Sequence, residues 1–295
     1  MDPRTVFLLI QLTLSLMDAQ GEPLQCPSRA NRNCRTNGSS RTNGTNRTNR
    51  TYRRDSTTDE ARADSKFPGW KLCGVSPWEM GDKYEGDIMV TTRLELRTFL
   101  GDKERQWQTT EIPYRIETLY FYDEETERIK AAIKEFNNFT CVSFRPATEN
   151  DTDYIVITGK TDGCYTTIGR AGGEQVLNLE PPACVYKKGC IYHQLMHALG
   201  FSHEHNSPIR DKYIRIHTQN IAKGKENFLK KLNPEDVTDY GYGYDYNSIM
   251  HGGRKAYSGN NRSTIEPVDE FASIGYKRKL SRIDIKKVNR HFGCI

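Results

Sequence analysis

The chain has 295 residues, of which 36% are hydrophobic and 10% aromatic, and this is enough apolar material for a folded core. No segment approaches the 18 or more apolar residues of a membrane span, so we expect no membrane-spanning helix. The net charge of +5 depends on eight arginines between Cys26 and Arg54, and without them the chain carries −3. Basicity confined to one tract argues against a folded nucleic-acid-binding face.

The chain begins MDPRTVFLLIQLTLSLMDA, which is typical of a secretory signal peptide. Arg4 gives the positive start, an apolar stretch follows, and Ala19 offers a cleavage site. We therefore predict a signal peptide over residues 1–19 and a secreted, extracellular protein. A buried N-terminal helix is the alternative.

Residues 20–65 contain a low-complexity tract rich in Arg, Asn and Thr. The tract has almost no apolar residues and cannot offset the entropy lost on folding, so we predict disorder. Secretion makes Asn-x-Ser/Thr sequons meaningful as glycosylation sites. Seven asparagines begin one: Asn37, Asn43, Asn46, Asn49, Asn138, Asn150 and Asn261. A glycosylated spacer is the prediction, and an arginine-rich arm for acidic polysaccharide is the alternative.

From Thr98 onward the pattern is globular. Apolar spacing and capping residues predict helices over residues 123–136, 220–232 and 281–293. Short apolar runs predict strands over residues 153–159 and 175–179. Ser281 and Asp284 form a capping pair for the last helix, and Gly293 ends it. Strands with one helix come first and a looser, helix-ended half follows, which predicts an α+β fold.

The stretch HQLMHALGFSHEH, residues 193–205, predicts a metal site. His193 and His197 lie four residues apart, so a helix presents both on one face. Gly200 tolerates the positive φ that ends a helix, and the chain then returns with His203. Three neutral imidazoles leave Zn²⁺ an open position, as in catalytic zinc sites. We therefore predict one Zn²⁺ per chain.

This stretch resembles the metzincin zinc-binding pattern H-E-x-x-H-x-x-G-x-x-H, and its letters GFSHEH are similar to the astacin family. SIMHGGRKAYS resembles the Met-turn of that family, with Met250 as the hydrophobic base beneath the metal. EIPYRI, GCYTTIGRAGGEQVLNL and RDKYIRI stand where the family would have them, and the resemblance extends from about Asp87 to Cys294. It implies an astacin-like α+β catalytic domain, in which an N-terminal mixed sheet with the zinc helix faces a looser C-terminal half across a cleft.

The resemblance also implies how the cysteines pair. It assigns the disulfides Cys141–Cys294 and Cys164–Cys184. Cys190 has no partner in that scheme. Pairing of Cys190 with a propeptide cysteine such as Cys73 is one option, and it would leave Cys26 with Cys34.

KYEGDIMV resembles the latency motif F-x-G-D of the family, with Tyr84 in the aromatic place. The resemblance implies that Asp87 takes the open position of the zinc ion, and a solvated loop acid is the alternative. It further implies a propeptide over residues 66–97, which a trypsin-like protease removes near Arg97, and a peptidase domain over residues 98–295. The new amino terminus would then be buried against Glu204.

Two positions depart from the family pattern. Gln194 stands where the family has its glutamate base, and an amide cannot accept the proton of the attacking water. Gly252 stands where the family has the Met-turn tyrosine that supports the oxyanion. Neither Glu204 nor Tyr257 is expected to replace these groups. A Glu-to-Gln change is also what an experimenter makes to trap a protease, but the second departure favours natural divergence.

The sequence therefore predicts a secreted zinc protein made as a zymogen, inactive or strongly impaired in peptide hydrolysis, that acts by binding peptides or proteins. The alternative is an active zinc endopeptidase that is activated by trypsin-like removal of the propeptide.

Overall fold

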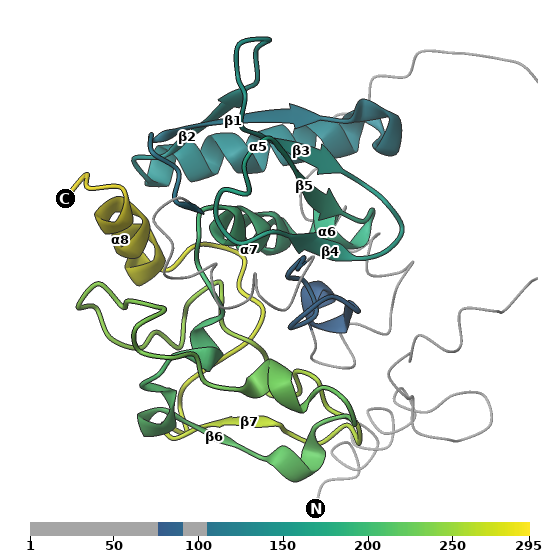
Figure 1. Cartoon of the computed structure of the whole chain (residues 1–295). Coiled ribbons are helices and arrows are strands. Elements are labelled where there is room, and N and C mark those ends of the chain that lie inside the picture. The colour runs from purple at the N-terminus through teal and green to yellow at the C-terminus, as the bar shows by residue number, and fades with distance from the viewer. Residues whose placement is uncertain (1–75, 91–104) are drawn as a thin grey trace, which may run out of the picture. The chain divides into compact units, whose positions relative to one another are not determined.

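The computed structural model describes residues 76–90 and 105–295 (Figure 1). The predicted signal peptide, the arginine-rich tract, the first four sequons and the cleavage site near Arg97 lie outside the described residues. Within the described part, no helix has the length and apolar character needed to cross a membrane.

A five-stranded mixed sheet forms the N-terminal half of the domain. Its strands are β1 (Glu111–Ile116), β2 (Ser143–Pro146), β3 (Tyr154–Thr158), β4 (Cys164–Thr166) and β5 (Glu174–Leu179). The order is β2-β1-β3-β5-β4, and only β4, at the edge, runs antiparallel to its neighbour. Four of the five residues of β3 are buried, as expected for a central parallel strand covered on both faces.

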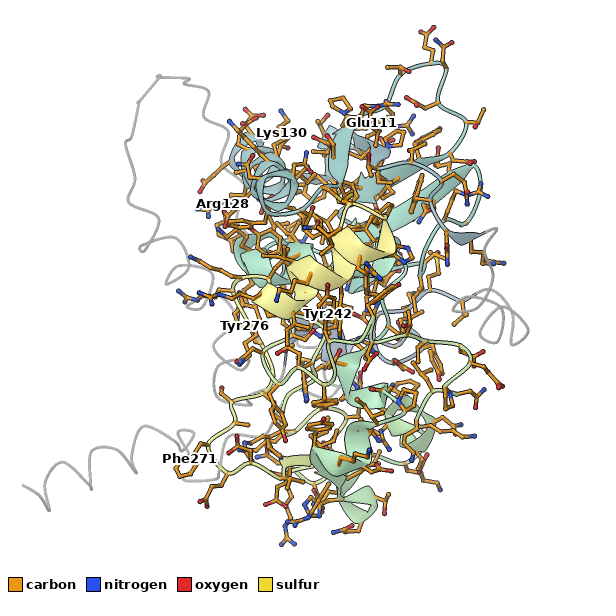
Figure 2. All side chains as sticks on the ribbon, turned by 90° about the vertical axis from the view of Figure 1, so that its left-hand side faces the viewer. Glu111, Arg128, Lys130, Tyr242, Phe271 and Tyr276 are labelled. Carbon is orange, nitrogen blue, oxygen red and sulfur yellow. A yellow bond between two sulfur atoms is a disulfide. The ribbon has the colours of Figure 1, made fainter. Side chains whose placement is uncertain are left out.

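Helices α5 (Asp123–Phe139) and α7 (Lys188–Ala198) pack with the short α6 (Ala183–Tyr186) against this sheet. Ile129, Ile133 and Phe136 of α5 are buried, which confirms the helical face predicted from their spacing. The outer face of α5 is charged, and Arg128 and Lys130 form ion pairs along it (Figure 2). By contrast, α7 is buried from Gly189 to Ala198, so it crosses the core and brings its polar side chains into the interior.

The C-terminal half has little regular structure. It contains the two-stranded antiparallel sheet of β6 (Ile214–Ile216) and β7 (Ile265–Pro267) and ends in α8 (Arg282–His291). Its short 3₁₀ helices are η5 (Glu204–Asn206), η6 (Arg210–Lys212), η7 (Thr218–Asn220) and η8 (Glu226–Leu229).

One helix prediction succeeded in this half and one failed. The Ser281 hydroxyl accepts the amide of Asp284 at 2.8 Å, which confirms the predicted cap of the last helix. The predicted helix over residues 220–232 is wrong. Gly224 adopts a φ of +86° there and separates two single turns, because a left-handed residue cannot continue an α-helix.

Residues 76–90, which we call the docked segment, lie below β4 in Figure 1. The segment opens with the 3₁₀ helix η2 (Pro77–Met80), and Ile88 then forms a parallel bridge with Thr166 of β4. Trp78 is only 1% exposed and packs within the main hydrophobic core. The docked segment is therefore bound by backbone pairing and by burial of an aromatic side chain.

Candidate metal centre

Three histidines meet in the interior, as their spacing suggested. His193 and His197 project from α7, and the chain reverses at Gly200, whose φ is +108°. His203 follows the reversal. All three side chains are at most 2% exposed, and one ring nitrogen of each lies within 4.8 Å of the others and of the carboxylate of Asp87.

The rings of His193 and His197 are oriented for metal binding. The Nδ1 of His193 lies 2.9 Å from the carbonyl oxygen of Ile249, and that of His197 lies 2.8 Å from the carbonyl oxygen of Phe201. A carbonyl only accepts, so each Nδ1 carries the proton and each Nε2 presents a lone pair to the interior. The Nε2 of His197 is buried without a hydrogen-bond partner. An unpaired buried nitrogen of this kind fits a metal ligand.

Asp87 closes the fourth side of this group. One oxygen of its fully buried carboxylate lies 2.8 Å from Nε2 of His193 and 3.3 Å from Nε2 of His197, and the other lies 3.4 Å from Nε2 of His203. Burial alone would raise the pKa of Asp87, but the surrounding imidazoles hold it well below its ordinary value. The group therefore combines three imidazoles with an anionic oxygen, which is a donor set that suits tetrahedral Zn²⁺. We call these four residues the cage.

Gln194 faces the cage from the same helix. Its Nε2 donates a 2.9 Å hydrogen bond to the Asp87 oxygen that contacts His193, and its Oε1 is buried without a partner. The amide can therefore hold an oxygen atom at the cage by donating to it. It has no basic site that would take a proton from water at neutral pH.

Gly252 follows the buried Met250 by two residues, and its amide donates to Nδ1 of His205 at 3.0 Å. A Cβ at Gly252 would lie 2.9 Å from that nitrogen and 3.4 Å from Oε1 of Glu79. The space that a side chain at Gly252 would enter therefore borders the docked segment.

Glu79 of the docked segment also borders this region, although the sequence did not predict it. Its carboxylate accepts the amide of Gly253 at 2.6 Å and the amide of Ser76 at 2.9 Å. Burial raises the pKa of Glu79 to about 7. The only local signal was the S-x-x-E spacing of a capping box, which does not indicate a contact 174 residues away.

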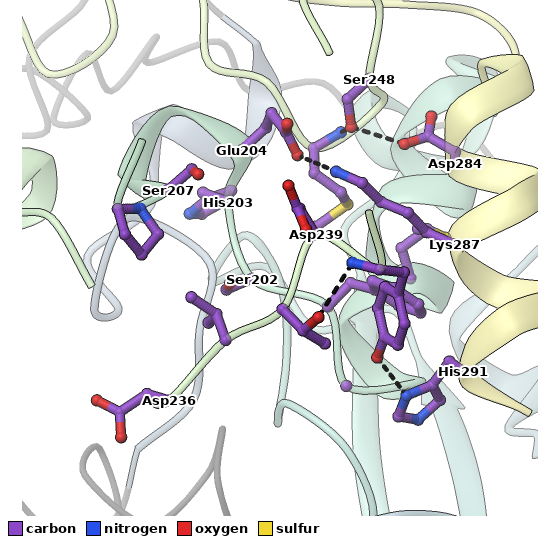
Figure 3. A pocket seen from close by; sticks show the side chains of 18 of the residues that line it. Ser202, His203, Glu204, Ser207, Asp236, Asp239, Ser248, Asp284, Lys287 and His291 are labelled. Carbon is purple, nitrogen blue, oxygen red and sulfur yellow. Dashed lines mark hydrogen bonds and ion pairs between the residues drawn. The ribbon is translucent and has the colours of Figure 1, made fainter. Parts of the chain in front are cut away.

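Glu204 lies in a pocket of about 620 Å³ (Figure 3). Its carboxylate binds Nζ of Lys287 at 2.8 Å and the amide of Asp245 at 2.8 Å. Burial raises the pKa of Glu204 although Lys287 opposes the shift. The partner of Glu204 in this structure is therefore Lys287, and burial of a new amino terminus against Glu204 stays a prediction.

Both disulfides implied by the resemblance are formed in the structure, Cys141–Cys294 and Cys164–Cys184. The first ties the segment after α5 to the segment after α8, and the second ties β4 to α6. Cys190 is a free thiol, so the option that it pairs with a propeptide cysteine is wrong. Cys26, Cys34 and Cys73 lie outside the described residues. Burial raises the pKa of Cys190 well above its ordinary value, which makes it a poor nucleophile.

The asparagines of the three sequons within the described residues are exposed, as glycosylation requires: Asn138, Asn150 and Asn261. Their modification stays a prediction.

Comparison with known proteins gives consistent matches. Residues 99–293 match the family model named Astacin, which describes a family of peptidases. The chain is 40% identical over 192 residues to zinc metalloproteinase nas-14 of Caenorhabditis elegans. This alignment covers 65% of this chain and 38% of that protein. It is 35% identical over 222 residues to the low choriolytic enzyme of Oryzias latipes. This alignment covers 73% of this chain and 79% of that enzyme.

A solved structure shows the same fold. High choriolytic enzyme 1, a hatching enzyme zinc-protease of the medaka fish Oryzias latipes, superimposes with a TM-score of 0.60 at 36% identity, covering 66% of this chain and 97% of that one. The chain spans only 38, 50 and 56% of three nematode relatives, nas-14, nas-13 and nas-7.

Proposed function

The chain belongs to the astacin family of peptidases, and from this premise we propose that it is a secreted zinc protein that binds peptides but hydrolyses them poorly or not at all. One observation carries this proposal. The side chain that faces the carboxylate oxygen of Asp87 in the cage is the amide of Gln194, which donates to that oxygen at 2.9 Å and is no general base.

His193, His197 and His203 would hold one Zn²⁺, with Asp87 as a fourth ligand in the precursor. When bound, the ion would polarise a peptide carbonyl and acidify water. The protein side of the chemistry is incomplete. Gln194 can orient a water molecule or a carbonyl but cannot accept a proton, and a positioned general base contributes about 10²–10⁴-fold in rate.

Gly252 has no side chain that could donate a hydrogen bond to the oxyanion, and loss of one such donor lowers the rate about 10²–10³-fold. Groups that act on the same intermediate are not additive. We therefore expect a combined deficit on the order of 10⁴-fold.

The docked segment supports a peptide-binding role. The amide of Met89 donates to the carbonyl of Thr166 at 2.8 Å, and the amide of Thr166 donates to the carbonyl of Asp87 at 3.0 Å. Edge strand β4 therefore accepts a peptide by backbone pairing, which is independent of the side chains of the peptide. A peptide or protein ligand would use the same edge after the docked segment has left.

A precursor form is part of this proposal. Residues 1–19 would be a signal peptide, residues 20–65 a glycosylated spacer, residues 66–97 a propeptide removed by a trypsin-like protease, and residues 98–295 the astacin-like domain. The position of Asp87 inside the cage supports latency. Two disulfides in the domain support export to an oxidising compartment.

The alternative is an active zinc endopeptidase. The latency contact favours it, because a protein that never hydrolyses peptides has no need of a carboxylate at the cage.

The test compares the native chain with variants at the two altered positions. The secreted precursor is cut with trypsin, checked for one zinc per chain, and assayed on casein and a peptide library. Gln194→Glu, Gly252→Tyr and the double change are assayed alongside, with the exposed Gln108→Glu as the matched control.

We expect the double change to raise the rate on the order of 10⁴-fold and Gln108→Glu to change nothing. If Gly252→Tyr proves too crowded to fold, Gln194→Glu alone should still give at least about 10²-fold. A native rate within about tenfold of the Gln194→Glu rate overturns the proposal and favours the active endopeptidase.

A further inference from the structure

Tyr257 contacts the docked segment through its backbone. The side chain is 4% exposed, and its hydroxyl donates a 2.6 Å hydrogen bond to the carbonyl oxygen of Glu85. The acceptor is a main-chain oxygen, which every peptide carries at every residue. The contact itself therefore uses no side chain of the docked segment.

The backbone at this contact is unusual on both sides. Tyr257 has a φ of +58° and Glu85 a φ of +48°. Left-handed conformations are uncommon outside glycine and rare for bulky residues. They persist where the surroundings enforce them, and they cluster at binding and catalytic sites.

The surroundings of Tyr257 fix its ring. Phe228 packs against it edge-on with ring centroids 5.3 Å apart, and the amide of Ala222 donates to the Tyr257 carbonyl at 2.9 Å. Contacts from outside the docked segment thus restrain the ring, and such restraint lowers the ordering entropy lost on binding.

The contact has a defined place relative to the cage. Glu85 precedes Asp87 by two residues, and its carboxylate lies 2.7 Å from Nδ1 of His203. On the other side, Thr166 binds the backbone of Asp87 and Met89. Between these contacts the segment turns, because the amide of Gly86 donates to the carbonyl of Lys83 at 3.0 Å and the amide of Ile88 donates to that of Tyr84 at 2.9 Å. Tyr257 therefore holds the turn that precedes Asp87, and β4 holds the backbone of Asp87 itself.

We propose that Tyr257 is a positioning residue for peptide ligands at this site. After the docked segment leaves, its hydroxyl donates to a backbone carbonyl of the incoming peptide, two residues from the group that faces the cage. The inference rests on the proposed peptide-binding function and deepens it. It does not restore what Gly252 lacks, because the hydroxyl meets a carbonyl displaced from the cage by two residues.

The test is a double-mutant cycle between the hydroxyl and the carbonyl. The full chain is folded, cut with trypsin and freed of the docked segment. Trp78 is the one residue of the docked segment in the main buried cluster, so every other member of that cluster stays in the remaining domain. The probes are a labelled peptide KYEGDIMV and the same peptide with a thioamide at the Glu carbonyl, which is a weaker acceptor. Dissociation constants are measured by fluorescence anisotropy on zinc-loaded protein.

Tyr257→Phe removes only the hydroxyl. Tyr246→Phe is the matched control, since that hydroxyl donates to the carbonyl of Tyr213 at 2.5 Å, within the C-terminal half. We expect Tyr257→Phe to weaken binding of the normal peptide about 3- to 10-fold, and Tyr246→Phe to change it less than about twofold. We expect the thioamide to weaken binding to the native protein and to have no further effect on Tyr257→Phe.

Equal thioamide effects in the native protein and in Tyr257→Phe overturn the role of Tyr257 and leave peptide binding intact. If the native domain binds neither peptide, the peptide-binding function itself is refuted, and the role of Tyr257 with it.

Discussion

The cage and the two positions beside it differ in the chemistry that their side chains offer. In the cage, each of the three histidines keeps a partner that fixes its ring, and a carboxylate completes the set. Beside the cage, Gln194 lacks the acid–base chemistry of a glutamate and Gly252 lacks any side chain. We therefore predict that holding a metal and hydrolysing a peptide depend on separable residues of one fold. Four predictions test this separation, from the largest expected effect to the smallest.

Removal of one cage histidine should abolish metal binding. His197→Ala deletes one of three imidazoles whose nitrogens converge within 4.8 Å. Because even second-shell changes cost about 10–100-fold in metal affinity, we expect a loss of more than about 100-fold for this ligand. Zinc content after dialysis against a weak chelator measures the effect. His217→Ala, which breaks only an ion pair with Glu266, is the control and should keep one zinc per chain.

Asp87→Asn should loosen the docked segment. The change removes the anionic oxygen from the cage but keeps the shape of the side chain. Hydrogen bonds to charged groups are worth more than neutral ones, so we expect the amide of Met89 to exchange about 10- to 100-fold faster in the precursor. Hydrogen exchange read by mass spectrometry measures this. Asp82→Asn on the same segment is the control, and equal acceleration in both variants would refute a special role of Asp87.

Docking of the segment should weaken as the pH rises from 6 to 8. Burial raises the pKa of Glu79 to about 7 in the docked state, against an ordinary value of 4.5. The docked state then binds the proton of Glu79 more tightly than the undocked state does. The stabilisation of docking by this proton is therefore complete below pH 4.5 and is lost as the pH rises through about 7. The two values give a change of about tenfold in the docking equilibrium between pH 6 and 8. Protease sensitivity of residues 76–90 reports it, and Glu79→Gln should flatten the profile.

Gly252→Ala should destabilise the precursor slightly. The added Cβ would lie 2.9 Å from the ring of His205, so the ring or the turn must shift. Overpacking at the low end of its range costs about 1 kcal/mol, which lowers the Tm of a domain of this size by about 2–4 °C. Calorimetry of both chains measures the difference. An unchanged or higher Tm would show that the turn is not adapted to glycine.

The parts of the fold that the sequence predicted correctly are those marked by local patterns of residues. The periodicity of Ile129, Ile133 and Phe136 located α5, and the Ser281–Asp284 cap located the start of α8. Histidine spacing brought His193 and His197 onto one helical face. These features depend on neighbours within a few residues, which a sequence displays directly.

The failures concern long-range contacts and one local break. Glu79 meets Gly253 across 174 residues, and Lys287 meets Glu204 across 83, and no pattern in the sequence marks either pair. The helix predicted around Gly224 failed because one left-handed glycine overrode a run of good helix formers.

The most direct test of the account measures binding and cleavage on one peptide. Zinc-loaded native protein, freed of the docked segment, is incubated with a peptide that it binds. The peptide is then recovered and its mass is determined by mass spectrometry. We predict that the peptide is recovered intact, and that any fragments form at least about 10²-fold more slowly than with Gln194→Glu at comparable affinity. Recovery of two fragments at a rate within about tenfold of that variant would contradict it.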